Sequence, residues 1–270
     1  MPDKEIKLIA LDVDGTIMDR NFNISGQVKS AIKKTIDKGI YVLIATGRMY
    51  SATVPVAKHL ELKTPLIVYQ GSLIQEFYES NKILMHHTVP SDVSMQVVKD
   101  LREYGVQINA YINDKLYAEK ISPILDEYAS KRNTTMVKVD NFESISNFEP
   151  TKLLGLDYDI NLVDKIKNEL KEKYKGVINI TKSTPNFCEF VNNKCSKANS
   201  ILFLAEKWGI NKSQIMAIGD QENDKEMLEI AEIGVAMGNG DKELQGMADY
   251  ITDTVDNNGA AHAIKKFILD

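Results

Sequence analysis

Two carboxylates end the first apolar run of the sequence, in "LIALDVDGT", where one residue separates Asp12 from Asp14. Residues i and i+2 of an extended chain point to the same side, so we expect both carboxylates to face one point beyond a strand end. Negative charges held that close repel, and each is driven toward protonation unless a cation or hydrogen-bond donors offset the repulsion. Mg²⁺ suits such a site because it takes carboxylate oxygens and keeps several waters. Asp-Gly also forms ordinary solvated turns, so this chemistry requires partners elsewhere in the chain.

Further apolar runs also end in polar or glycine-rich residues. The third run leads into "YQGS". The other residues of this kind are Thr46, Gly47 and Arg48 after the second run, and Asp220, Asn223 and Asp224 in "DQEND" after a later one. Open parallel sheets bind ligands outside the carboxyl ends of their strands. Each segment alone is explained by a turn or by an acidic first helical turn, but their occurrence at four strand ends favours one shared site.

The segments that must position these residues alternate between strand and helix patterns. Apolar runs at 6–11, 41–46 and 65–70 are separated by amphipathic stretches at 25–39 and 50–62, which predicts βαβαβ. The alternation resumes after residue 214 and continues to the end of the sequence. Runs that are apolar on both faces are typical of a parallel sheet covered by helices.

The middle of the chain has a different pattern. Charged amphipathic helices are predicted at 91–104, 121–131 and 161–174, between strands that alternate as in a half-exposed antiparallel sheet. We therefore predict an α/β fold, a Rossmann-like core with a central parallel sheet, into which an α+β domain is inserted. The predicted division is 1–84 for the first part of the core, 85–186 for the inserted domain and 187–270 for the second part of the core.

Composition bounds the class of protein. The 270 residues are 43% hydrophobic and 26% charged, as in folded globular chains, and the net charge of -5 argues against a nucleic-acid binder that neutralises phosphates. Cys188 and Cys195 match no disulfide or metal motif and indicate a cytoplasmic protein with reduced thiols. No apolar run approaches the ~18 residues of a membrane span, and no signal-peptide pattern precedes the first strand. We expect a cytoplasmic monomer or homodimer without a membrane or nucleic-acid partner.

Four segments in order carry a resemblance to a known family. "LDVDGT", "IATGR", "CSKANSI" and "GDQENDKEML" resemble the four motifs of the haloacid dehalogenase (HAD) superfamily, and within it the Cof-type sugar-phosphatase-like hydrolases with a large α+β (type IIB) cap. The resemblance covers essentially the whole chain, and the first and fourth motifs together are highly specific. The insertion lies where this subfamily places its cap.

The resemblance implies a phosphatase that hydrolyses small phosphorylated metabolites such as sugar phosphates. Asp12 is then the nucleophile that forms an aspartyl-phosphate, and Asp14 is the acid that protonates the leaving oxygen and the base that activates water. It also implies Mg²⁺, bound by the Asp12 carboxylate, the main-chain carbonyl of Asp14 and Asp220, with support from Asp224.

The same resemblance assigns the groups that face the phosphate. Lys197 offsets the charge of nucleophile and phosphate, and it is counted with Thr46 among the catalytic residues. The Thr46 hydroxyl, the Gly47 amide and Asn223 donate hydrogen bonds to phosphoryl oxygens, and Arg48 is assigned to substrate binding with them.

Some choices stay open from the sequence. Gln70 stands where the family usually has Asn before Gly, so substrate preference does not transfer. Tyr111, Asn113 and Tyr117 lie in cap segments that could face a substrate. Phosphoryl transfer to another acceptor, as in phosphomutases of the same superfamily, is one alternative activity. A phosphoacceptor signalling module is another, which Asp14, Lys197 and the inserted domain disfavour.

Overall fold

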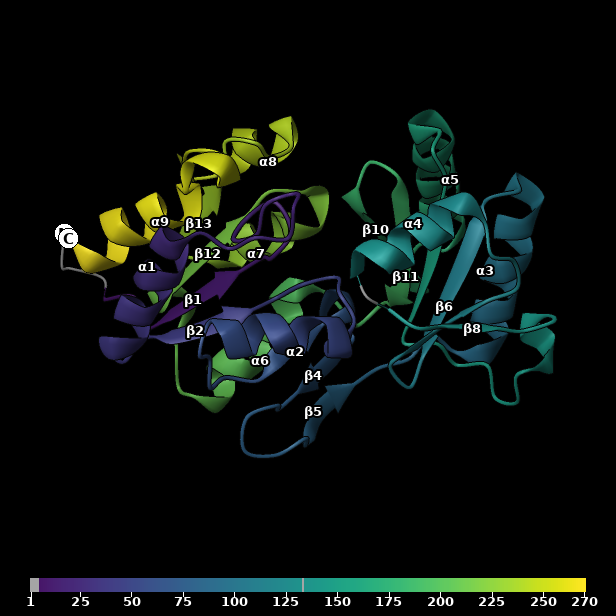
Figure 1. The fold of residues 1–270 in the computed structure, drawn as a ribbon, viewed down its shortest axis with the longest axis horizontal. Coiled ribbons are helices and arrows are strands. Elements are labelled where there is room, and N and C mark those ends of the chain that lie inside the picture. Colours follow the sequence, from purple (N-terminus) through teal and green to yellow (C-terminus); the bar gives the residue numbers. More distant parts are fainter. Residues whose placement is uncertain (1–4, 133) are drawn as a thin grey trace.

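A five-stranded parallel sheet forms the centre of the core in the computed structural model, which describes residues 5–132 and 134–270. Its strand order is β14-β13-β12-β1-β2, and Figure 1 labels the last four of these strands. The strands are β1 (Leu8–Leu11), β2 (Tyr41–Ile44), β12 (Ile215–Gly219), β13 (Ile233–Ala236) and β14 (Tyr250–Ile251). Leu11 pairs with Ile44 on one side and Ile218 on the other, so these three strands end at one level.

Helices cover both faces of this sheet, which is why its strands are apolar throughout. Ile9 and Leu11 pack on the face covered by α1, α2 and α9, whereas Leu8 and Ala10 pack on the face covered by α6, α7 and α8. These helices are α1 (Gly26–Asp37), α2 (Tyr50–His59), α6 (Lys197–Lys207), α7 (Lys225–Ile230), α8 (Lys242–Met247) and α9 (Gly259–Ile264).

The third apolar run joins the sheet only weakly. Strand β3 (Leu66–Val68) contacts the β2 segment through one parallel bridge, between Ala45 and Ile67, and then pairs antiparallel with β4 (Leu73–Gln75). Strand β5 (Ile83–His86) completes this three-stranded sheet. The chain reverses after β3 because Tyr69 and Gln70 adopt left-handed backbone angles, with φ of 52° and 59°.

A six-stranded sheet with order β10-β11-β9-β6-β7-β8 builds the inserted domain, hereafter the cap. Neighbouring strands are antiparallel except β7 and β8. Its strands are β6 (Gln107–Ile112), β7 (Lys115–Ala118), β8 (Met136–Lys138), β9 (Lys152–Leu156), β10 (Ile178–Thr184) and β11 (Phe187–Asn192). Helices α3 (Ser91–Tyr104) and α5 (Ile160–Lys173) pack on one face, and α4 (Pro123–Arg132) packs on the face that shares a hydrophobic cluster with the core. The predicted fold class is therefore confirmed.

The chain crosses between core and cap twice, at neighbouring places. The predicted division after residue 84 falls inside β5, and the division after 186 falls between the paired strands β10 and β11. The Asn192 side chain donates a hydrogen bond of 2.8 Å to the carbonyl of Thr88, which joins the two crossing segments. We propose that the cap spans residues 88–192, because β11 pairs with the cap strands β9 and β10.

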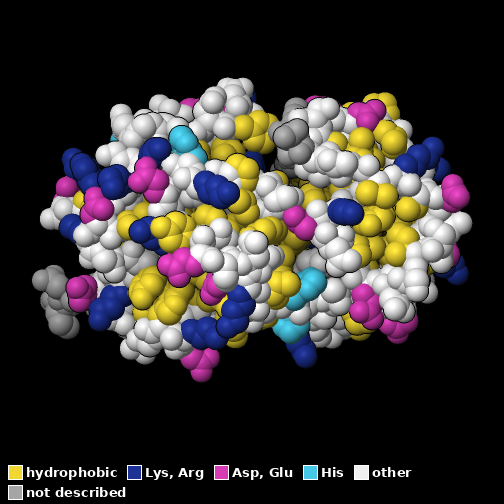
Figure 2. Space-filling view, turned by 60° about the horizontal axis from the view of Figure 1, so that its bottom comes forward, with side chains coloured by type: hydrophobic (Ala, Val, Ile, Leu, Met, Phe, Trp, Pro, Cys, Tyr) yellow, Lys and Arg dark blue, Asp and Glu magenta, His cyan; other side chains and the backbone are white. Residues whose placement is uncertain are grey.

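The surface carries both signs of charge. Basic and acidic side chains are interspersed over the face shown in Figure 2. Among residues 5–132 and 134–270, no helix combines the length and apolar character needed to cross a membrane.

Candidate active site

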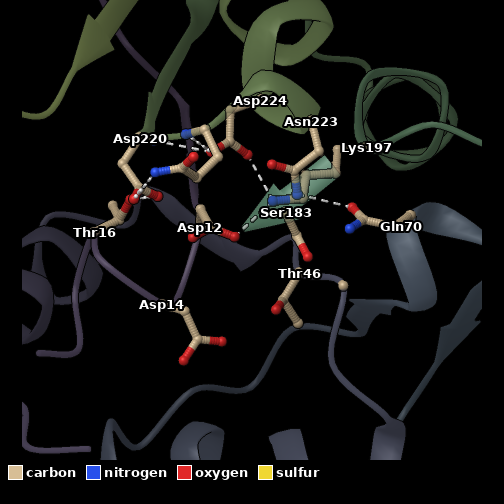
Figure 3. A network of polar contacts seen from close by, with 12 residues as sticks. Asp12, Asp14, Thr16, Thr46, Gln70, Ser183, Lys197, Asp220, Asn223 and Asp224 are labelled. Atoms are coloured by element: carbon tan, nitrogen blue, oxygen red, sulfur yellow. Dashed lines mark hydrogen bonds and ion pairs between the residues drawn. The ribbon is translucent and has the colours of Figure 1, made fainter. Parts of the chain in front are cut away.

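Four charged side chains meet at the carboxyl ends of the parallel strands (Figure 3). Asp12 follows β1, Asp220 follows β12, and Asp224 lies at the end of the short 3-10 helix Glu222–Asp224. Lys197 is the first residue of α6, and the Ser196 side chain caps that helix by accepting from the Asn199 amide. All four side chains are buried. The topology thus brings together residues that are up to 212 positions apart (12 to 224).

Lys197 pairs with two of the three carboxylates. Its ammonium lies 2.6 Å from Asp12 Oδ1 and 2.6 Å from Asp224 Oδ1. Oxygens of Asp12, Asp220 and Asp224 lie within 4.8 Å of one another. Three buried carboxylates thus face one ammonium, and this arrangement leaves an excess of negative charge that a cation can neutralise.

The acidity of these groups reflects that excess. Burial raises the pKa of Asp12 to about 7, and the charge of Asp224 acts in the same direction, while Lys197 opposes the shift. Burial and the charge of Asp12 raise the pKa of Asp220 well above its ordinary value. Burial alone lowers the pKa of Lys197, but the two carboxylates outweigh it and raise that pKa above the ordinary value. The raised pKa of Lys197 favours its charged form, and the raised pKa values of Asp12 and Asp220 mean that a metal bound there would displace protons.

Hydrogen bonds inside the cluster leave part of it free for a metal. Asp224 uses Oδ1 for Lys197, and its Oδ2 accepts from the amides of Asp220 and Gln221, at 2.9 and 3.1 Å. Asp220 accepts from the Thr16 hydroxyl at 3.2 Å and from the Gln221 side chain at 3.1 Å. Asp12 and Asp220 therefore fit as direct ligands of a hard divalent cation, and Asp224 fits as the group that orients Lys197 and the Asp220 backbone.

Gly15 makes room for the Asp220 carboxylate. Its φ is +83°, and a Cβ built there would lie 2.3 Å from Asp220 Oδ2. We expect Gly15→Ala to displace Asp220 and to weaken Mg²⁺ binding by about tenfold or more, because left-handed strain adds to the collision. Calorimetric titration with Mg²⁺ measures this change. Gly26→Ala is the matched control, since nothing lies within 4 Å of its Cβ; equal affinity in both variants would contradict the role of Gly15.

The Asp14 carboxylate lies apart from the cluster of Asp12, Asp220 and Asp224 (Figure 3). It lines the same pocket as Asp12, but its carboxylate accepts two hydrogen bonds from Arg48, 2.7 Å from Nε and 2.5 Å from Nη2. The Arg48 guanidinium also packs over the Phe22 ring at 5.4 Å. The structure thus gives Arg48, which was expected to bind substrate, a carboxylate partner within the protein. In Figure 3 the Asp14 carboxylate points away from the three clustered aspartates.

The remaining predicted residues surround the same pocket. It has a volume of about 40 Å³, room for only a few waters. Among the predicted residues, its walls include Asp12, Asp14, Thr46, Gly47, Arg48, Asp220 and Asn223. Lys197 and Asp224 reach the pocket through Asp12 and the backbone of Asp220.

The cap contributes residues that no sequence motif indicated. Lys152 of β9 and Glu189 of β11 line the pocket together with Ser183 of β10. Lys152 and Glu189 are 2% exposed and lie 3.0 Å apart as an ion pair. The sequence feature that could have identified them is a charged residue within each of the apolar segments "KLLGL" and "FCEFV". Charged side chains are rarely buried without a partner, so such residues indicate a buried pair.

The cap residues singled out in the sequence lie elsewhere. Tyr111 is buried, donates to the Tyr128 hydroxyl at 2.8 Å and packs edge-on against Tyr69. Tyr111, Asn113 and Tyr117 are absent from the pocket wall formed by the described residues.

Comparison with known proteins extends over nearly the whole chain. A family model described as haloacid dehalogenase-like hydrolase matches residues 9–264. Two proteins of Bacillus subtilis (strain 168), both named 5-amino-6-(5-phospho-D-ribitylamino)uracil phosphatase, are similar in sequence. YcsE is 34% identical, with 99% of this chain and 98% of the relative covered, and YitU is 29% identical, with 96% and 97% covered.

Solved structures are also similar to this chain. A haloacid dehalogenase-like hydrolase from Bacteroides thetaiotaomicron superposes with a TM-score of 0.84 at 29% identity, covering 98% of this chain and 100% of the other. The HAD subclass IIB sugar phosphatase BT4131 shares the fold, with a TM-score of 0.84 at 21% identity over 97% and 98% of the two chains. The chain is therefore an enzyme that belongs to the haloacid dehalogenase-like hydrolase family, and it has the core-and-cap fold of the family's phosphatases.

Proposed function

We propose that this protein is a Mg²⁺-dependent phosphatase that hydrolyses small phosphomonoesters through an aspartyl-phosphate on Asp12. The observation that carries the proposal is the buried cluster of Asp12, Asp220 and Asp224 around Lys197, which opens onto a polar pocket. Phosphoryl transfer requires chiefly positioning and neutralisation of negative charge, and these groups supply both.

The reaction has two steps in this proposal. A carboxylate oxygen of Asp12 attacks phosphorus, the bond from phosphorus to the ester oxygen breaks, and Asp14 gives a proton to the departing oxygen. Asp14 then takes a proton from a water, whose oxygen attacks phosphorus and releases phosphate from Asp12. Mg²⁺ held by Asp12, Asp220 and the Asp14 carbonyl, with support from Asp224, would neutralise charge on the phosphoryl oxygens. Thr46, Gly47 and Asn223 donate hydrogen bonds to those oxygens.

Asp14 must change partner to act as the acid. A carboxylate held by two guanidinium hydrogen bonds is stabilised in its ionised form, which can accept a proton but cannot donate one. We propose that Asp14 leaves Arg48 when substrate enters, and that Arg48 is then free to meet the negative charge of the substrate. With this change of partner, Arg48 pairs with Asp14 in the absence of substrate and binds the substrate when it is present, as the sequence predicted.

The substrate in this proposal is a small metabolite. A pocket of about 40 Å³ has no room for the organic part of an ester, so the cap must move to admit the substrate. We propose phosphate esters of sugars and polyols, since relatives named for a phosphoribityl compound are 34% and 29% identical to this chain. We place the reaction in the cytoplasm, consistent with two buried free cysteines.

Metal binding is expected to depend on pH. The Asp12 pKa of about 7 lies above its ordinary 3.8, so the metal-free folded protein holds this proton more tightly than the unfolded chain. Protonated Asp12 therefore stabilises the metal-free fold fully below about pH 4, and this stabilisation is lost as pH rises through 7. Mg²⁺ must displace the protons of Asp12 and of Asp220, whose pKa is also raised, so we expect its affinity to rise steeply with pH as pH increases through 7. Calorimetry at several pH values measures this, and a flat profile would contradict the assignment of Asp12 as a ligand.

Activity tests the proposal as a whole. Phosphate release is measured from hexose phosphates, flavin mononucleotide, pyridoxal phosphate and nucleotides, each with Mg²⁺ or with EDTA. We expect turnover that EDTA abolishes and that excess Mg²⁺ restores. Absence of turnover on every ester by the folded, Mg²⁺-loaded protein would favour a phosphomutase or a signalling role.

A further inference from the structure

A continuous set of hydrogen bonds joins the cap to two loops of the phosphate pocket. Lys152 donates to the carbonyl of Gly47 at 2.6 Å and to Glu189 Oε2 at 3.0 Å. Gln70 donates to the same Glu189 oxygen at 2.9 Å, and the Asn223 side chain donates to Gln70 Oε1 at 3.0 Å. We call these five residues the interdomain chain. Three of them belong to the core and two belong to the cap.

The interdomain chain is complete only while the cap contacts the core. Lys152, Glu189 and Gln70 are each 2% exposed, and a buried ion pair is costly unless hydrogen bonds satisfy it fully. The cap alone supplies Ser183, which donates to Glu189 Oε1. The contacts of Lys152 with Gly47 and of Glu189 with Gln70 are lost when the cap moves away. Closure of the cap is therefore coupled to the arrangement of the core loops.

Gly47 and Asn223 depend on this arrangement. A Cβ at Gly47 would lie 2.4 Å from Gln70 Nε2 and 3.3 Å from Glu189 Oε2, so the Gln70 side chain fills the space that a larger residue would need. Asn223 Oδ1 is buried and has no hydrogen-bond partner within the residues that the structure describes. Gln70 is thus the group that orients the Asn223 amide, and one N–H of that amide remains for a phosphoryl oxygen.

We propose that Gln70, Lys152 and Glu189 are positioning residues for the phosphate site. With the cap closed, they hold the Gly47 main chain through its carbonyl and the Asn223 side chain through Gln70, so that the Gly47 N–H and the Asn223 amide can donate to the phosphoryl group. This inference rests on the proposed function, because it assigns those two donors to phosphate. In this inference Lys152 and Glu189 support binding of the phosphoryl group, which every substrate shares. They do not recognise the leaving group, which differs between substrates.

Inorganic phosphate separates these two roles because it has no leaving group. We would measure its dissociation constant by calorimetry in the presence of Mg²⁺ for the wild type and for Gln70→Leu, Lys152→Met and Glu189→Gln. We expect each variant to bind phosphate about tenfold more weakly, because about one hydrogen bond to the phosphate would be poorly oriented. The kcat/KM values for several esters should fall by a common factor, so that their ratios stay as in the wild type.

Two of the variants distinguish a loss of phosphate binding from a loss of folding. Gln70→Leu leaves the Lys152–Glu189 pair intact, so it remains informative if the charge variants unfold. Lys173→Met is the matched control, because it removes a cap lysine whose ion-pair partner Asp100, at 2.6 Å, also lies in the cap. Its phosphate affinity should stay within about twofold of the wild type.

The outcomes are distinct. Wild-type phosphate affinity in Gln70→Leu would overturn the inference while leaving the phosphatase proposal intact. Unchanged phosphate affinity with altered ratios between esters would make Lys152 and Glu189 leaving-group residues, which also overturns it. A wild type that neither binds phosphate nor hydrolyses any ester would instead remove the proposed function on which the inference rests.

Discussion

Asp12→Asn should lower phosphate release by about 10⁴-fold or more, because the amide cannot attack phosphorus and the covalent route is lost. The side chain keeps its shape, so binding of the ester should change far less than turnover. Steady-state phosphate release at saturating Mg²⁺ measures the effect. Turnover within tenfold of the wild type would contradict the assignment of Asp12 as the nucleophile.

Stability provides the control for this variant. Burial and the charge of Asp224 raise the pKa of Asp12 to about 7, so its ionised form is disfavoured in the metal-free protein. Replacing it with a neutral amide removes one of three buried carboxylates and relieves that cost. Above pH 7 and without metal, we therefore expect the unfolding temperature of the variant to equal or exceed that of the wild type. A loss of turnover with this stability locates the defect in the chemistry.

Lys197→Met should have the second-largest effect, and it acts on both activity and folding. The Lys197 ammonium is fully buried, 2.6 Å from both Asp12 and Asp224. Removing it leaves the carboxylates unpaired, which typically costs about 3–5 kcal/mol of stability at neutral pH. We also expect a loss of about 10²–10³ in kcat, because one positive charge opposite the phosphoryl group is missing.

Metal and pH distinguish this electrostatic explanation from simple loss of packing. Mg²⁺ should restore part of the stability, since it supplies positive charge to the same carboxylates. The deficit should shrink as pH falls through 7, the value to which burial raises the pKa of Asp12, because protonation of Asp12 removes one of the unpaired charges. Lys207→Met, at the exposed end of the same helix, should change neither property. A deficit that is independent of both pH and Mg²⁺ would contradict the electrostatic role of Lys197.

The core could be predicted because its signals are local. Apolar runs without alternation indicated a parallel sheet, and the polar residues after β1, β2 and β12 indicated one edge of it. The alternation rule placed Asp12 and Asp14 at one strand end, and both line one pocket. It could not show that Asp14 turns toward Arg48, because that choice depends on the loop after β2.

The cap contacts could not be predicted for a related reason. Lys152 and Glu189 are 37 residues apart in the sequence, and their partners Gly47 and Gln70 come from the core. Nothing in "KLLGL" or "FCEFV" specifies that docking. The bounds of the cap were also hard to place from the sequence, because only the pairing of β11 with β9 and β10 supports the end that we propose.

A burst experiment tests whether Asp12 carries the phosphoryl group and Asp14 activates the water that removes it. Asp14→Asn is mixed with Mg²⁺ and para-nitrophenyl phosphate, whose leaving group needs no acid, and the reaction is quenched for peptide mass analysis. We expect a rapid burst of about one nitrophenolate per enzyme, slow turnover afterwards, and a phosphoryl group on the peptide that contains Asp12. A variant that forms no burst and no phosphopeptide, while the wild type turns over, would contradict the account, as would a phosphoryl group on any other residue.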